Sequence, residues 1–151
     1  MIALFLALQT AVPATPPPPA GIAGSPLGAI PRQQLPDTGC AVFLWSKGDR
    51  HELVAMASAE PARLRLTIDG KPVDLARGEQ DGAASFGFAA TTHYRVGTTE
   101  VTLDMMIASD PSLTQGGTVP GATLTLVRPD QDGVVLPVGG LIGCAPAPRG
   151  G

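Results

Sequence analysis

A series of short, β-prone segments separated by turn-forming residues occupies the chain between residues 40 and 144, and it limits the fold more than any other feature. The clearest segment, residues 62–69, alternates arginine, threonine and aspartate with leucine and isoleucine. That alternation has the period of two expected of a strand with one buried face. Asp69-Gly70, which follows at once, is a strong hairpin signal. This region therefore predicts a strand that leads into a tight turn.

Similar segments recur along the chain. We predict further strands at residues 40–46, 51–58, 72–75, 85–96, 99–108, 122–127 and 134–138, and loops at 77–84 and 111–121. The 19 glycines and 16 prolines favour many short strands over long helices. We expect an all-β domain, an antiparallel β-sandwich of about seven to nine short strands, immunoglobulin-like or similar, with a small β-barrel as the alternative.

Two cysteines, Cys40 and Cys144, are the only ones in the chain. An even pair downstream of an export-like segment predicts one disulfide. That bond would join the first predicted strand of the domain to its last segment. Closing a loop of about 100 residues is worth roughly 4.7 kcal/mol in the chain-entropy model.

The composition changes on either side of this region define the domain organisation. Residues 1–14 are apolar and end in small residues, which is typical of a signal peptide, although no lysine or arginine precedes the apolar run. Residues 15–39 contain four consecutive prolines and few large apolar groups, so we expect a disordered linker. The β-domain is predicted at 40–145 and a disordered tail at 146–151. A periplasmic or secreted protein is expected, and the excess of arginine over lysine suggests a bacterial source.

Charge and hydropathy argue against nucleic-acid binding and against a membrane-spanning helix in the mature chain. The formal net charge is −3, and no basic patch with interleaved aromatics is visible, so we expect no nucleic-acid binding. No apolar stretch after the signal segment reaches the roughly 20 residues that a membrane-spanning helix needs. We therefore expect no transmembrane helix in the mature chain.

Catalytic and metal-binding patterns are weak. The nucleophile motif Gly-x-Ser-x-Gly is absent, and no cofactor motif is found. His51 and His93 are the only histidines, and methionines such as Met56, Met105 and Met106 could add soft ligands, but no fixed spacing links them. We predict no catalytic, cofactor-binding or metal-binding residues, and keep His51 and His93 as the residues of an alternative function.

Two other patterns have simpler interpretations. Residues 35–39 resemble the LPxTG sorting signal of sortase substrates, but neither the hydrophobic anchor nor the basic tail of that family follows, so a turn before the first strand is the better interpretation. Phe86 and Phe88 are spaced to share one face of a strand, which favours core packing over a ligand platform.

These observations favour an exported, non-enzymatic binding or assembly module of the periplasm or cell envelope, with an unidentified protein or envelope partner. An exposed sheet edge near Pro72 or the glycine-rich loops is where a partner strand could add. The alternative is a small exported hydrolase or metal-binding protein that uses His51 and His93.

Overall fold

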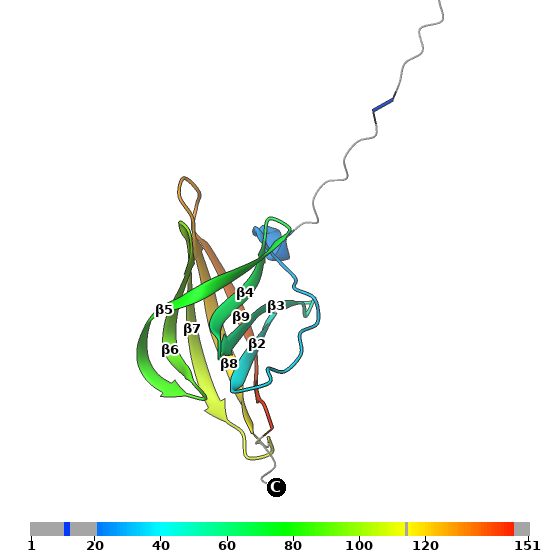
Figure 1. Cartoon of the computed structure of the whole chain (residues 1–151). Coiled ribbons are helices and arrows are strands. Elements are labelled where there is room, and N and C mark those ends of the chain that lie inside the picture. Colours follow the sequence, from blue (N-terminus) through cyan, green and yellow to red (C-terminus); the bar gives the residue numbers. More distant parts are fainter. Residues whose placement is uncertain (1–10, 13–20, 114, 147–151) are drawn as a thin grey trace, which may run out of the picture.

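The computed structural model of the chain describes residues 11–12, 21–113 and 115–146 (Figure 1). The regular elements of this part are one 3-10 turn and a series of β-strands, so the predicted all-β class is confirmed. They are η1 (Ile22–Gly24), β1 (Leu27–Gly28), β2 (Cys40–Ser46), β3 (Leu53–Ala59), β4 (Ala62–Ile68), β5 (Lys71–Ser85), β6 (Phe88–Val96), β7 (Thr99–Ser109), β8 (Gly116–Val127) and β9 (Val134–Cys144).

Strands β2 to β9 form a closed antiparallel barrel. Each strand pairs with the next along the chain, and β9 pairs with β2 to close the ring. The small barrel offered as the alternative is therefore the architecture found, in place of two packed sheets. Closure gives most backbone N–H and C=O groups a partner in a neighbouring strand, which an open sheet edge cannot do.

The inward side chains follow the predicted alternation. On β4, Leu64 and Leu66 are buried while Arg63 and Arg65 face outward. The same pattern recurs on β2, β7, β8 and β9, whose fully or nearly buried residues include Val42, Leu44, Val101, Leu103, Leu124, Leu126, Leu136 and Val138. An eight-stranded barrel is just wide enough for its side chains to fill. The core is therefore the barrel interior.

Two segments predicted to be loops belong to strands. Residues 77–84 form the second half of β5, and β8 begins at Gly116 inside the stretch predicted as loop 111–121. Both stretches are rich in glycine and polar residues, which disfavour strands by local propensity. Their pairing with β6 and β7 overrides that propensity.

The N-terminal segment differs most from its prediction. Residues 21–39 of the expected linker lie against the barrel. Within them, β1 pairs with the last residues of β4, which β3 does not pair with. Leu27 and Ile30 of this segment are 0% and 5% exposed, and the Ile30 amide donates to the Leu53 carbonyl. Residue 40 is therefore not the start of the packed structure. The predicted signal segment lies mostly outside the described residues, as do residues 15–20 and 147–151.

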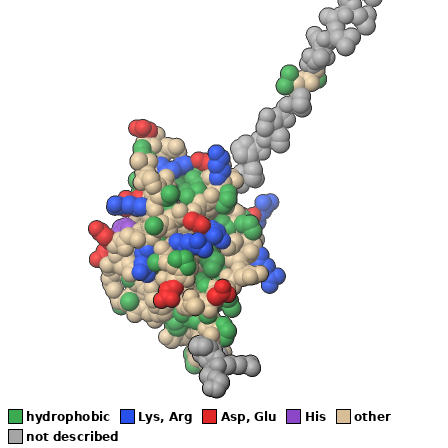
Figure 2. Space-filling model, in the orientation of Figure 1, with side chains coloured by type: hydrophobic (Ala, Val, Ile, Leu, Met, Phe, Trp, Pro, Cys, Tyr) green, Lys and Arg blue, Asp and Glu red, His purple; other side chains and the backbone are tan. Residues whose placement is uncertain are grey.

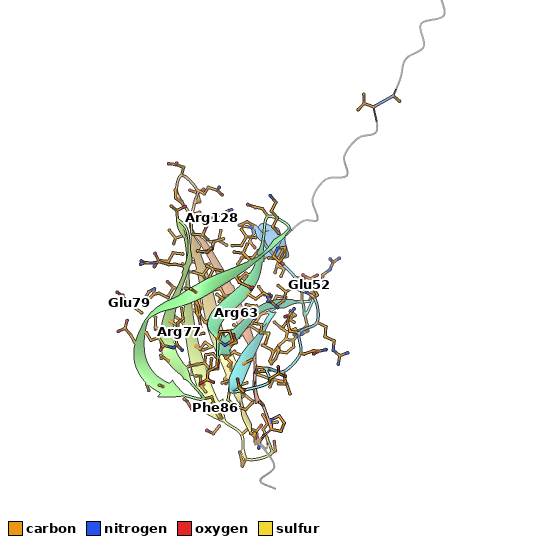
Figure 3. All side chains as sticks on the ribbon, in the orientation of Figure 1. Glu52, Arg63, Arg77, Glu79, Phe86 and Arg128 are labelled. Carbon is orange, nitrogen blue, oxygen red and sulfur yellow. A yellow bond between two sulfur atoms is a disulfide. The ribbon has the colours of Figure 1, made fainter. Side chains whose placement is uncertain are left out.

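The cysteine pair and Phe86 lie at the end of the barrel opposite η1 (Figure 1 and Figure 3). Cys40 and Cys144 face each other where β2 and β9 pair, with an S–S distance of 2.01 Å. Phe86 lies in the tight turn between β5 and β6, not on a strand beside Phe88 (Figure 3). A Cβ on Gly117 would approach the Phe86 ring to 2.9 Å, so that glycine makes room for the ring.

Candidate functional site

The two histidines lie far apart around the barrel. His51 is exposed in the connection between β2 and β3, and His93 is on β6, which is four strands from β2 in either direction. His93 Nδ1 lies 3.0 Å from Thr102 Oγ1 and 3.6 Å from Glu100 Oε1. Within the described residues, no group of three or more His, Cys, Asp or Glu side chains could hold a metal ion. The structure does not bring the two histidines together.

A groove on the outside of the barrel gathers more polar side chains. Residues 31–39, which we call the strap, cross the outer surface of the barrel between β1 and the start of β2. Burial of Leu27 and Ile30 fixes the beginning of the strap, and β2 fixes its end. The space between the strap and strands β3 and β4 has a volume of about 560 Å³. A groove of this size suits a small molecule or a short stretch of peptide.

Arginine side chains that point away from the barrel core supply the basic groups of the groove. Arg63 and Arg65 enter it from β4, because alternation points both away from the core. Arg32 enters from the strap. Asp37 and Glu60 also line the groove, so basic and acidic groups are both present. Figure 2 shows basic side chains at the centre of this face, and Arg63 lies there in Figure 3.

Hydrogen bonds to Asp74 and Gln33 hold the Arg65 side chain in place in the groove. Its guanidinium donates to both carboxylate oxygens of Asp74 on β5, at 2.9 and 3.2 Å, and to Gln33 Oε1 of the strap at 2.9 Å. The hydrogen bonds from Arg65 hold the pKa of Asp74 below its usual value. Arg65 therefore ties the strap to two strands of the barrel.

Arg63 and Arg32 make fewer close carboxylate contacts than Arg65 does. The nearest carboxylate contact of Arg63 is with Asp74 at 3.9 Å, and the Arg63 side chain is 45% exposed. Arg32 forms no ion pair with any residue in the described part of the chain. Both guanidiniums thus keep donors that face solvent in the groove.

Sequence reasoning found the outward face of β4 but not the groove. Alternation placed Arg63 and Arg65 at the surface. The strap was assigned to a linker, so nothing in the pattern placed Arg32 or Gln33 beside β4. A local signal was present in the large apolar residues Leu27 and Ile30, which are unusual in a free spacer.

No helix in the described part of the chain has the length and apolar character needed to cross a membrane. No protein-family model, curated protein or solved structure shows significant similarity to the chain.

Proposed function

We propose that this protein is an exported, non-catalytic binding module of the periplasm or cell envelope, and that the groove under the strap binds a carboxylate-bearing segment of a partner. The observation that carries the proposal is that Arg63 and Arg32 share one groove, where Arg63 reaches its nearest carboxylate, Asp74, only at 3.9 Å and Arg32 has no ion pair with the described residues. Export is supported by the apolar N-terminal segment and by the cysteine pair at bonding distance.

Arginine favours this ligand class for geometric reasons. Its planar guanidinium presents a fork of donors that matches the two oxygens of a carboxylate. Arg65 and Asp74 form such a forked pair across β4 and β5. Arg63, two residues before Arg65 on the same face, can offer the same fork to an external carboxylate.

The other groups in the groove support binding rather than turnover. Ser58 lines the groove, but its hydroxyl donates to the Pro61 carbonyl at 2.6 Å. The groove contains neither His51 nor His93, so no imidazole is placed to activate that hydroxyl. The apolar side chain of Met56 and the polar strap provide contacts for the rest of a peptide.

Titration with hexaglutamate, followed by NMR on the full oxidised chain, tests the proposal. Saturable shifts should appear at Arg63, Arg32 and Gln33, and hexaglutamine should produce none. Arg63→Gln should weaken hexaglutamate binding about tenfold, the equivalent of roughly 1.4 kcal/mol. Affinity should also fall as salt is raised.

Arg50→Gln is the matched control, because Arg50 is exposed in the connection between β2 and β3 and does not line the groove. It should bind hexaglutamate like the wild type. Equal losses in both variants would mean diffuse charge attraction and would overturn the proposal, as would the absence of saturable shifts. The double variant His51→Ala, His93→Ala should retain binding, whereas a hydrolase or metal protein built on these histidines would lose its activity.

A further inference from the structure

A second hollow on the outside of the barrel lies beside the beginning of the packed N-terminal segment. We call it the N-terminal pocket, and it is lined by residues of the stretch 21–31, by Glu52, by the end of β4 and by the turn that leads into β5. Its volume is about 550 Å³, within the range that suits a small molecule. Its lining shares no residue with that of the groove under the strap.

The wall that residues 21–31 provide is held in place by the core. Leu27 of β1 points inward and is 0% exposed, and its neighbours Pro26 and Gly28 line the pocket on the outside. Leu27 pairs with Ile68, and Gly28 pairs with Thr67, which fixes this wall beside β4. A Cβ on Gly28 would lie 3.3 Å from Thr67 Cγ2, so the glycine permits the close approach. The pocket is therefore built into the fold.

Most of the lining is apolar. Its apolar side chains come from Ile22, Ala29 and three prolines, Pro26, Pro31 and Pro72. Proline adds an apolar ring and removes a backbone N–H, so these positions offer contact area without a hydrogen-bond donor. Each methylene group that a ligand buries against such a surface raises its affinity roughly fourfold. The walls thus suit a ligand with an apolar body.

Several donors around the pocket are already used within the chain. The Asp69 amide donates to the Pro26 carbonyl at 2.9 Å, and the Ser25 amide donates to the Ile22 carbonyl at 3.0 Å. The Ser25 hydroxyl donates to the Leu27 carbonyl at 3.4 Å. Among the described residues, no lysine or arginine lines the pocket. An anion would therefore find few donors here.

Glu52 supplies the charge of the pocket. It is half-buried in the connection between β2 and β3, and Figure 3 shows it on the side of the barrel where η1 lies. Its carboxylate forms no ion pair with any residue in the described part of the chain. Asp69 also lines the pocket, but its carboxylate accepts a hydrogen bond from Arg128 at 2.7 Å. The net negative charge of the pocket is therefore that of Glu52, and it favours a cation.

We propose that the N-terminal pocket binds the primary alkylammonium group of a ligand. An ammonium group has three donors and no acceptor, which complements a carboxylate in a pocket with few free donors. The ammonium pairs with the Glu52 carboxylate, and the alkyl chain lies against the prolines. This ligand has the opposite charge to the one proposed for the groove under the strap.

The probe is n-butylammonium, titrated into the full oxidised chain at neutral pH and constant ionic strength and followed by NMR. Saturable shifts are expected at Glu52, Thr67 and Ala29. Methylammonium keeps the charge without most of the alkyl chain, and n-butanol keeps the chain without the charge, so each should bind about tenfold more weakly or worse. Equal affinity for methylammonium would mean charge attraction alone, and equal affinity for butanol would mean apolar contact alone. Either result would overturn the proposal, as would the absence of saturation.

A free amine and a lysine side chain both carry a primary alkylammonium group. Nα-acetyl-lysine N-methylamide presents this group on a peptide backbone. Tighter binding than that of butylammonium would identify a lysine of a partner protein as the ligand, and weaker binding would identify a free amine. Both results support the site.

Glu52→Gln removes the charge and should weaken butylammonium binding about fivefold or more, with butanol binding unchanged. Asp49→Asn is the matched control, because Asp49 is exposed in the same connection between β2 and β3 and does not line the pocket. It should bind butylammonium like the wild type. Unchanged affinity in Glu52→Gln, or an equal loss in both variants, would contradict the proposal. Arg63→Gln should keep full butylammonium affinity, so failure here is separable from failure of the groove.

Discussion

At the scale of single residues, the barrel changes the chemistry of its one tyrosine. The ring and hydroxyl of Tyr94 are buried among inward-facing side chains. Burial disfavours the charged tyrosinate and raises the pKa of Tyr94 to about 12, although the positive charge of Arg77 and the nearby Thr92 hydroxyl act in the opposite direction. Ionisation of this side chain therefore reports on whether water reaches the core at Tyr94.

Alkaline titration of the folded protein, followed by tyrosinate absorbance, should give a midpoint of about 12, against roughly 10 for the unfolded chain. Because the folded pKa is the higher one, the stability that neutral Tyr94 contributes is fully present below about pH 10. It is lost as the pH rises from there towards 12. Unfolding in denaturant should show this decline in the wild type but not in Tyr94→Phe. A folded midpoint near 10 would mean that water reaches the hydroxyl.

At the scale of elements, β5 combines two kinds of strand. Residues 71–75 pair with β4 alone and bury Leu75, whereas residues 77–85 pair with β6 alone, and Ala76 between them pairs with both strands. Charged side chains and bulges on a free edge protect it from pairing with other chains. Pro72, where a free edge was predicted, lies at the start of β5 and pairs with Thr67 of β4 on one side only. A second unpaired edge, on the β4 side, begins at Arg77.

The glycines at the two bulges in the pairing of β5 with β6, Gly78 and Gly82, should respond differently to alanine. Gly82 has a φ of +87°, and an added Cβ would lie 2.9 Å from Ala90 Cβ. Gly82→Ala should therefore lower the free energy of unfolding by about 1–2 kcal/mol. Gly78→Ala is the matched control, because its nearest contact would be 3.4 Å from the His93 carbonyl oxygen and its φ is not positive. It should be neutral or stabilise by less than about 1 kcal/mol. Equal effects in urea unfolding would argue against the bulge geometry at Gly82.

At the scale of the whole molecule, the barrel is completed by contacts between distant parts of the chain. β2 and β9 pair along the full length of β2 and place Cys40 opposite Cys144. β1 adds Leu27 to the core through its pairing with Ile68. The packed structure therefore begins upstream of the first cysteine.

Leu27→Ala tests this extent of the fold. Leu27 is fully buried, so its truncation should cost about 2–5 kcal/mol of unfolding free energy. Leu35→Ala is the control, because Leu35 is 54% exposed on the strap and should change stability by less than about 0.5 kcal/mol. Denaturant unfolding measures both. If Leu27→Ala were as stable as the control, residues 21–39 would be a linker, as the composition alone suggested.

The local sequence pattern determined the all-β class, the buried faces of β4, β7 and β8, and the turn at Asp69-Gly70. These features depend on neighbouring residues, since a period of two shows which face is buried without reference to the rest of the chain. The sequence also identified the two cysteines as a pair. It did not predict that β9 would return to β2 and close a barrel.

Only the tertiary structure decided the rest. Closure of the barrel and the strap across β3 and β4 both depend on which distant segments meet. Arg32 and Arg63 are far apart in sequence and share a groove only because Leu27 and Ile30 anchor the strap. Arg77 and Tyr94 meet because β5 and β6 pair in register at that point. Local periodicity contains no information on these long-range pairings, and the groove under the strap is formed by them.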